Sequence, residues 1–265
     1  MSCPKCVEGY ELPGEPKGSI QAEFQGAYFT AFQSQDASSS GSNTSKRAVV
    51  LLTDGFGLPL KNCKVIADKL STSLECDVWI PDYFQGRPLI PLNAMSGPDK
   101  ASQKMSILDW IKFIFINGIP SIPAFISSRP SVVDARLASF FALLKEKKPH
   151  YEKIGAVGYC YGGSAVIRLA STSSIHSVVV CHPGQFSMKE VRQMKVPSSW
   201  ACPEEAIFAA RKDKPEFVEY EFKDYPGTQH GFAARPNLAY PEIVEAHEKA
   251  LEQTISWFKK TLVVG

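Results

Sequence analysis

The stretch KIGAVGYCYGGSAVIRLAS, residues Lys153–Ser171, sets a cysteine between glycines where an apolar run changes to a helical pattern. The run before the cysteine has the small and β-branched residues of a buried strand, and apolar residues recur at helical spacing after it. A strand that turns into a helix at G-x-nucleophile-x-G holds the nucleophile exposed above the sheet edge. Glycines flank it because larger side chains would collide in so tight a turn. We therefore predict a nucleophile elbow with Cys160 at its tip.

The position of Cys160 also favours a reactive side chain. At the N-terminus of the following helix, the helix dipole and the free amides stabilise a thiolate. The alternative is a buried structural cysteine in a glycine-rich turn. The succession of strand, turn and helix favours the nucleophile.

Strand and helix patterns alternate along most of the chain, which is typical of a parallel sheet covered by helices on both faces. Ligands in such folds bind at the carboxyl ends of the strands. With 265 residues and 44% hydrophobic content, the chain is long enough for one large α/β domain. The predicted strands are 47–54, 76–82, 153–159, 176–184 and 217–227, and the predicted helices are 62–73, 131–149, 162–171 and 240–262.

Two stretches interrupt this alternation. The segment Gln33–Arg47 is polar and serine-rich, which predicts a mobile hairpin or loop. The segment Gly86–Pro130 is rich in aromatic residues and proline. It is either a lid or wall over the ligand site, or a core helix followed by a loop that proline breaks.

The charge balance limits the kind of partner. Lysine and arginine number 29 against 27 aspartate and glutamate residues. This near-neutral balance provides no basic stripe for nucleic acid and no polybasic patch for a membrane surface. We therefore expect a small-molecule partner, and the sequence leaves open whether two copies form a homodimer.

The seven scattered cysteines do not resemble the paired framework of a small secreted domain, so we expect thiols. The N-terminus lacks the pattern of a signal peptide, and no apolar run reaches bilayer-spanning length, so we expect a cytoplasmic protein. Cys3 and Cys6 form one CxxC without a second pair or a zinc-like cluster. We interpret them as inert thiols of an exposed tail and expect no metal.

A nucleophile at an elbow needs a base, and in enzymes with such an elbow the chain order is nucleophile, acid, histidine. Five histidines compete for this role. His150 and His176 precede predicted strands, His182 follows one, and we expect His247 on the exposed face of the last helix. His230 lies in YPGTQHGFAARP, between the final strand and the final helix. The chain order therefore selects His230.

An oxyanion hole normally uses the amide after the nucleophile and one amide from a loop after an early strand. The first is the amide of Tyr161. The loop LLTDGFGLP provides the second, from Phe56 or Gly57. A glycine-rich turn without function is the alternative for this loop.

Four motifs in order resemble the dienelactone hydrolase family, particularly its fungal members: LTDGFGL after the first buried strand, PDYF after the second, VGYCYGG, and HGFAARP. The similarity runs from about Gly26 to Leu262. It implies an α/β-hydrolase fold, a Cys-His-Asp triad, no cofactor, and hydrolysis of an enol-lactone to the ring-opened acid. By this resemblance, residues 26–265 form the hydrolase domain and residues 1–25 an N-terminal extension.

The resemblance carries over Cys160 as nucleophile and His230 as base. It also carries Asp54 to the position where the family keeps a carboxylate near the resting thiol. Gly55 departs from the family, because related sequences usually have a larger apolar residue there.

The bacterial members bind the substrate carboxylate through two arginines. Here Arg87 and Arg235 lie near the matching positions but are offset by one residue. Together with Asp54 and with Tyr83 of the PDYF motif, they are the predicted substrate-binding residues.

The triad acid is the third departure. After the strand VPSSWAC the family has an aspartate in an acidic loop, whereas this chain reads CPEEAIFAARKDK, which is shorter and has no aspartate at that point. We predict Glu205, with Glu204 as the alternative, because glutamate replaces aspartate in some triads. Both also fit the acidic first turn of a helix that begins after Pro203. Asp213 and Asp224 are weaker candidates.

These residues predict a cysteine-dependent carboxylic ester hydrolase of the dienelactone hydrolase type, acting on small lactones or esters. A glutaminase also has a cysteine elbow, but it usually has an acid two residues after the histidine, where this chain has Phe232. The alternative from another class is a pseudo-hydrolase that binds ligand with an incomplete triad. Loss of the orienting acid typically lowers the rate by about four orders of magnitude without abolishing binding.

Overall fold

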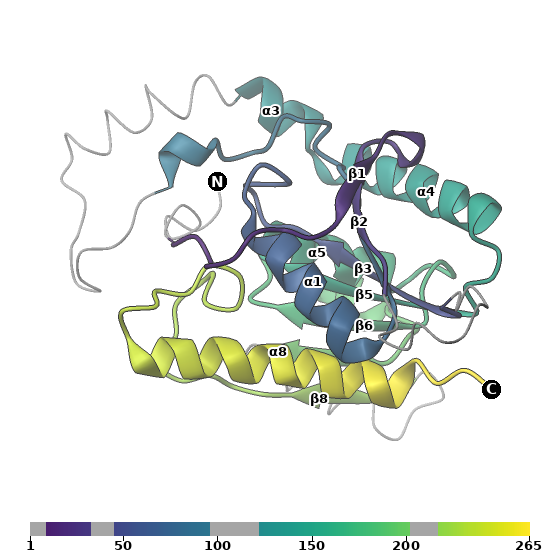
Figure 1. The fold of residues 1–265 in the computed structure, drawn as a ribbon. Helices are drawn as coiled ribbons and strands as arrows, with labels where there is room; N and C mark the ends of the chain where they lie inside the picture. Colours follow the sequence, from purple (N-terminus) through teal and green to yellow (C-terminus); the bar gives the residue numbers. More distant parts are fainter. Residues whose placement is uncertain (1–8, 33–44, 96–121, 202–216) are drawn as a thin grey trace, which may run out of the picture.

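The computed structural model describes residues 9–32, 45–95, 122–201 and 217–265. Within these residues, one eight-stranded sheet has the order β1-β2-β4-β3-β5-β6-β7-β8 (Figure 1). The pairs β1/β2 and β2/β4 are antiparallel and every other pair is parallel, which confirms the predicted mostly parallel sheet. The strands are β1 Ser19–Gln21, β2 Ala27–Thr30, β3 Arg47–Leu52, β4 Asp77–Ile80, β5 Lys153–Tyr159, β6 Ser177–Cys181, β7 Ser198–Ala201 and β8 Tyr220–Phe222.

The central strands are buried on both faces because alternate side chains contribute to two separate cores. In β3, Val49 and Leu51 face one core, and Ala48, Val50 and Leu52 face the other. Side chains along a strand point alternately to opposite faces, so an unbroken apolar run fills both cores. The run RAVVLL therefore folds as a central parallel strand.

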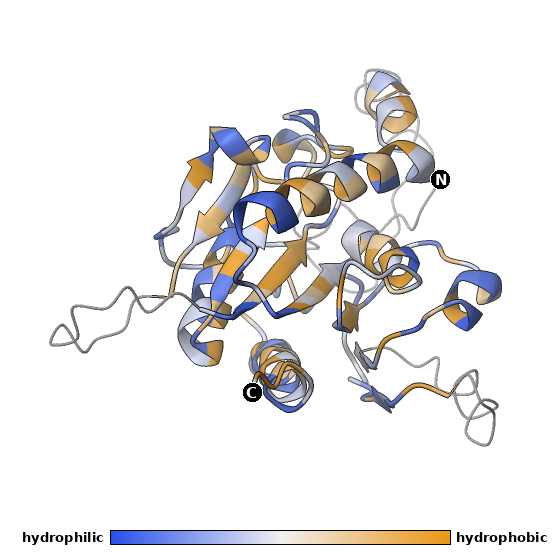
Figure 2. Cartoon of the chain, turned by 90° about the vertical axis from the view of Figure 1, so that its right-hand side faces the viewer, coloured by the Kyte–Doolittle hydropathy of each residue, from blue (hydrophilic) through white to orange (hydrophobic). Residues whose placement is uncertain are grey.

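Helices cover both faces of the sheet, as the alternating pattern predicts. The helices α1 and α8 pack on one face, where Figure 1 shows them side by side, and α4, α5 and α6 cover the other. In the ribbon coloured by hydropathy, hydrophobic residues are concentrated on the strands and on the helix faces toward them, and hydrophilic residues on the outward helix faces (Figure 2). The helices are η2 Ala22–Phe24, α1 Asn62–Leu74, η3 Leu92–Ala94, α3 Ile122–Ser127, α4 Pro130–Lys147, α5 Tyr161–Leu169, α6 Met188–Arg192 and α8 Pro241–Thr261.

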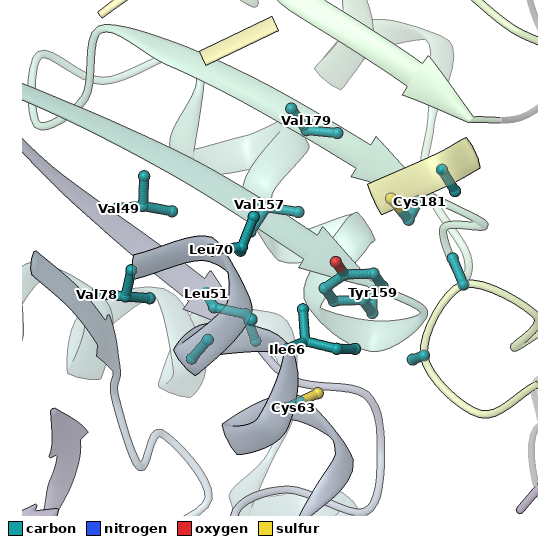
Figure 3. Packing of buried hydrophobic residues seen from close by; sticks show 14 of the residues in the cluster. Val49, Leu51, Cys63, Ile66, Leu70, Val78, Val157, Tyr159, Val179 and Cys181 are labelled. Atoms are coloured by element: carbon teal, nitrogen blue, oxygen red, sulfur yellow. The ribbon is translucent and has the colours of Figure 1, made fainter. Parts of the chain in front are cut away.

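The contact between α1 and the sheet brings the core close to the predicted elbow. Figure 3 shows Ile66 and Cys63 of α1 beside Tyr159, the last residue of β5. All three side chains are buried. The first turn of α1 therefore supports the strand end that precedes Cys160.

His247 corrects one expectation. The side chain is 4% exposed and belongs to the buried stripe of α8, together with Ala246, Ala250 and Trp257. Residues three and four apart share a helix face, so a position three before Ala250 lies on the buried side. The prediction of an exposed His247 is wrong.

The two stretches that interrupt the alternation lie largely outside the described residues. Residues 33–44 and 96–121 are not described. The described end of the second stretch forms α3, on which Ile122, Phe125 and Ile126 are exposed.

Residues 9–25, part of the predicted N-terminal extension, lie against the domain. Leu12 is buried in the core with α1, and β1 adds an edge strand to the sheet. The fully buried Asn62 accepts from the Leu12 amide at 2.9 Å and donates to the carbonyls of Tyr10 at 2.7 Å and Ala234 at 2.9 Å. One amide therefore joins this segment to the loop that contains His230.

Candidate active site

Strand, turn and helix meet at Cys160 in the predicted order. Cys160 follows β5 and occupies the N-cap position of α5 with φ of 52° and ψ of −112°. A positive φ in a residue with a side chain is uncommon and costs about 1 to 3 kcal/mol. Such strain is concentrated at functional sites. Cys160 is 4% exposed.

The glycines around Cys160 are required by close backbone contacts. A Cβ at Gly158 would lie 2.1 Å from the carbonyl oxygen of Gly162, and a Cβ at Gly162 would lie 2.2 Å from the carbonyl oxygen of Leu52. Real Cβ atoms do not approach backbone so closely. The glycines therefore let α5 begin directly against the ends of β3 and β5.

Backbone hydrogen bonds attach the turn after β6 to the elbow. The Cys160 amide donates to the carbonyl of Cys181 at 3.2 Å, and the Gly184 amide donates to the carbonyl of Cys160 at 2.8 Å. Between these two contacts lies His182, with a positive φ of 34°. Because β5 and β6 are parallel neighbours, Cys160 and His182 lie at the same edge of the sheet.

His230 packs its ring on His182. The ring centroids are 5.0 Å apart and the ring planes are inclined by 69°. Within the described part of the chain, Nε2 of His230 and both ring nitrogens of His182 are buried without a hydrogen-bond partner. Burial lowers the pKa of His182 well below its usual range, and the neighbouring His230 and Arg235 lower it further. His182 is therefore a neutral imidazole between the elbow and the predicted base.

Asp54 and Arg235, both predicted to bind substrate, form an ion pair with each other. The guanidinium lies 4.9 Å from the centroid of the Phe56 ring. A Cβ at Gly231 would lie 2.7 Å from Nη2 of Arg235, so glycine at this position makes room for the guanidinium. Arg87 is exposed, whereas Arg235 is 3% exposed, so the two arginines differ in environment.

The two amides that we predicted as oxyanion donors in the early loop are already engaged. The Phe56 amide donates to Oδ1 of Asp54 at 3.0 Å, and the Gly57 amide donates to the Asp54 carbonyl at 3.1 Å. A side chain and a carbonyl of the same residue thus occupy both donors. Among the described residues, the amides of Gly55 and Tyr161 have no acceptor.

Tyr161, the residue after Cys160, is held by its side chain. Its hydroxyl donates to the carbonyl of Ser128, and its ring stacks on Tyr83 with centroids 6.1 Å apart. The Tyr83 hydroxyl donates to the carbonyl of Thr53 at 2.6 Å. The Tyr83 hydroxyl is therefore engaged with the backbone, and its buried ring supports Tyr161.

The described cysteines are thiols, as expected. Burial raises the pKa of Cys63 well above its ordinary value and raises the pKa of Cys76 and of Cys181 to about 12. These three thiols are therefore protonated near neutral pH. Cys3 and Cys6 lie outside the described residues.

The candidates for the triad acid lie on either side of β8 in the sequence. Glu204, Glu205 and Asp213 lie outside the described residues, and Asp224 is exposed.

A cavity of about 160 Å³ adjoins His230 and is lined on its other sides by Tyr10 and Glu242, among other residues.

Sequence reasoning missed three residues around His230: His182, Asn62 and Glu242. The signal for His182 was present, because it directly follows a predicted strand at the edge where ligands bind. Nothing in the local sequence marks Asn62 or Glu242, because their contacts are with segments distant along the chain.

The described residues contain no group of three or more side chains suited to hold a metal ion. Nor does any helix in the described ranges have the length and apolar character needed to cross a membrane.

A mostly parallel sheet with a cysteine at a strand–helix elbow and a histidine in the last loop defines a hydrolase of the α/β type. The model of the dienelactone hydrolase family matches residues 122–262, just over half of the chain. The chain therefore belongs to the dienelactone hydrolase family. This confirms the predicted family, fold and enzyme class, a carboxylic ester hydrolase.

Curated relatives cover nearly the whole chain. Hydrolase tropI of Talaromyces stipitatus is 26% identical over 270 residues, which cover 98% of this chain and 96% of the relative. The human carboxymethylenebutenolidase homolog is also 26% identical over 270 residues, with 97% and 96% covered.

Solved structures have the same fold. A putative dienelactone hydrolase from Klebsiella pneumoniae matches with a TM-score of 0.57 at 15% identity, covering 88% of this chain and 98% of that one. Carboxyl esterase 2 from Tuber melanosporum matches with a TM-score of 0.55 at 12% identity, covering 98% and 92%.

Proposed function

We propose that this protein is a cysteine-dependent hydrolase of small lactones or esters, of the carboxymethylenebutenolidase type, with Cys160 as nucleophile and His230 as base. The observation that carries this proposal is the strained conformation of Cys160 at the N-terminus of α5. A histidine pair at the same edge of the sheet supports it. The name of the human relative, carboxymethylenebutenolidase homolog, points to the same substrate class.

The reaction has two halves. Sγ of Cys160 attacks the carbonyl carbon while its proton passes to His230, so that an S–C bond forms and the carbonyl oxygen becomes an oxyanion. When the oxyanion collapses, the ester C–O bond breaks, the leaving oxygen takes the proton from His230, and a thioester remains. Water then attacks the thioester with His230 as base, which releases the acid and restores the thiol. In a lactone, the leaving oxygen stays attached to the acyl chain.

The oxyanion needs donors that point at the developing charge. We propose the amide of Tyr161 and one amide of the loop 54–57. Phe56 and Gly57 already donate to Asp54, which favours the Gly55 amide in the conformation described.

The orienting acid in this proposal is Glu205, with Glu204 as the alternative. Its support is its place in the chain, directly after β7, the strand next to β6 and His182.

The charges around the site favour a neutral substrate. Arg235 and Asp54 neutralise each other, and the predicted partner arginine, Arg87, is exposed. A substrate carboxylate held between two arginines would require this ion pair to open. We therefore propose a neutral lactone or ester, which differs from the carboxyl-bearing lactone in the human relative's name, with the ring of Tyr83 as part of the wall.

The test is turnover of p-nitrophenyl acetate by the full chain and by Cys160→Ala. We expect turnover to disappear in Cys160→Ala and to persist in Cys76→Ala, which removes a buried thiol at the opposite edge of the sheet. Turnover that survives in Cys160→Ala would overturn the cysteine mechanism. A wild-type protein that is alkylated at Cys160 and hydrolyses no ester would instead identify a pseudo-hydrolase.

We further propose that residues 26–265 form the hydrolase domain and that residues 9–25 work as part of its site. The contact of Gly9 with Arg235 supports this, because a Cβ there would lie 2.6 Å from Cβ of Arg235.

The thiols of the described cysteines fit a reducing compartment such as the cytoplasm. A homodimer stays a hypothesis that sedimentation can test.

A further inference from the structure

His182 combines three features that a packing role does not explain. Its side chain is 7% exposed, and neither ring nitrogen has a partner within the described residues. Its backbone has a φ of 34°, a conformation that is unfavourable for most side chains. Buried polar groups are nearly always hydrogen-bonded, so an exception at a strained residue indicates a functional constraint.

The surroundings of His182 decide its charge. Its ring packs between Tyr159 of β5 at 5.9 Å, Phe232 at 5.8 Å and His230 at 5.0 Å, all between ring centroids. The charged groups that act on it are His230 and Arg235, both from the loop between β8 and α8 and both cations when protonated. Tyr159 is a neutral phenol, because burial raises its pKa well above its ordinary value. These surroundings keep His182 neutral.

A neutral imidazole has one nitrogen with a free lone pair and one that carries a proton. Two imidazole rings whose centroids lie 5.0 Å apart are within reach of an N–H···N hydrogen bond after a small ring rotation. Nε2 of His230 is itself buried without a partner among the described residues. One N–H···N bond between the rings would give a partner to Nε2 of His230 and to one nitrogen of His182.

We propose that His182 is a positioning residue for His230, which accepts a hydrogen bond from the His230 imidazolium once His230 has taken the proton of Cys160. This role rests on the proposed function, because it presupposes the proton transfer from Cys160 to His230. The proton leaves Sγ and binds a nitrogen of His230, from which the leaving oxygen later takes it, while the lone pair of His182 accepts an N–H of the imidazolium. His182 keeps its own single proton throughout.

The position of His182 in the chain suits this role. The hydrogen bonds on either side of it attach its turn to Cys160, at 3.2 Å through Cys181 and at 2.8 Å through Gly184. Any movement of this turn relative to the elbow would break them. His182 thus fixes the His230 ring relative to the nucleophile.

The experiment is an NMR titration of the His230 ring. The chain has five histidines, so single substitutions assign each ring signal. In His182→Phe we expect the His230 midpoint to fall by about one pH unit, because the charged form loses a hydrogen-bond acceptor. His182→Asn keeps an acceptor oxygen and tolerates a positive φ, so it should restore the midpoint. If His182→Phe does not fold, His182→Gly removes the ring and relieves the backbone strain.

The matched control is His247→Phe. His247 is also buried, has no partner for either ring nitrogen among the described residues, and lies beside the backbone of Phe232 and Ala233. We expect its replacement to change the unfolding midpoint but not the His230 titration. An unchanged His230 midpoint in folded His182→Phe, or an equal shift in His247→Phe, would overturn the positioning role.

A second readout separates this proposal from the proposed function. The pH profile of Cys160 alkylation by iodoacetamide reports the thiolate–imidazolium pair without any ester substrate. We expect about a tenfold lower alkylation rate near neutral pH in His182→Phe, the equivalent of one pH unit. If wild type hydrolyses no ester but these shifts occur, the proposed function fails and the positioning role stands.

Discussion

The carboxylate of Asp54 and the guanidinium of Arg235 form a buried ion pair although the two residues are 181 positions apart in the chain. Their side chains are 1% and 0% exposed. The pair joins the loop after β3 to the loop that carries His230. It therefore helps to hold the predicted base near the elbow, and it withdraws one predicted substrate-binding arginine from solvent.

Breaking this pair should destabilise the protein strongly. Arg235→Met leaves the Asp54 carboxylate buried and unpaired, and we expect a loss of about 3 to 5 kcal/mol in the free energy of unfolding. The double variant Asp54→Asn with Arg235→Met should recover part of that loss, because no charge is left uncompensated. Urea unfolding of the three proteins measures the difference. A double variant less stable than Arg235→Met would contradict this account.

Cys160 should be the described thiol that iodoacetamide labels fastest near neutral pH. Cys63, Cys76 and Cys181 are held as protonated thiols because burial raises their pKa. Mass mapping after a brief treatment measures the order of labelling. Labelling of Cys63 before Cys160 would count against the elbow as a thiolate site.

His230→Ala should abolish ester hydrolysis, because no other histidine lies on the loop opposite the elbow. The control is His176→Ala, an exposed histidine just before β6, at the other edge of the sheet. We expect its kcat/KM to match that of wild type. His247→Ala should leave hydrolysis nearly untouched while lowering stability, because its ring is buried. Equal loss of activity in all three would mean that the base is misplaced.

Stability should decrease as the pH falls below about 6.5. Burial lowers the pKa of His182 and of His247 in the folded protein, so below the unfolded-state value the unfolded chain binds protons that the folded chain does not. Unfolding is then favoured progressively until the folded-state values are reached. Urea unfolding between pH 7.5 and 5 measures the slope. In His182→Asn the slope should be shallower, and an unchanged slope would show that His182 does not contribute.

Asn62→Ala should loosen the His230 loop and the segment 9–25 together. Three hydrogen bonds of a buried side chain are lost, and we expect a decrease of about 3 kcal/mol in the free energy of unfolding. Asn237→Ala, which removes one exposed turn contact, should cost less than about 1 kcal/mol. Faster amide exchange at Leu12 and Ala234 in Asn62→Ala alone would locate the effect. An unchanged exchange rate at both residues would contradict the proposed link between segment 9–25 and the His230 loop.

Local patterns in the chain were sufficient for the fold class and for the elbow. An unbroken apolar run, whose successive side chains are buried on opposite faces of the sheet, predicts a central strand. The bounds of β3 and β5 lie within a few residues of the predicted ones. The glycines around Cys160 predicted a tight turn because the steric demand there is local. The choice of His230 from the chain order stays a prediction, although its loop lies where the order requires.

The tertiary structure alone decided which side chains meet around that elbow. The pairing of Asp54 with Arg235, the three contacts of Asn62 and the edge-to-face contact of His182 with His230 all join segments distant along the chain. The buried position of His247 likewise depends on which face of α8 the sheet covers. Residue spacing does not encode such contacts, because they depend on how separate strands end at a shared edge. Hydrophobic periodicity and turn sterics act over a few residues, whereas ion pairs and ring contacts form only after the sheet has assembled.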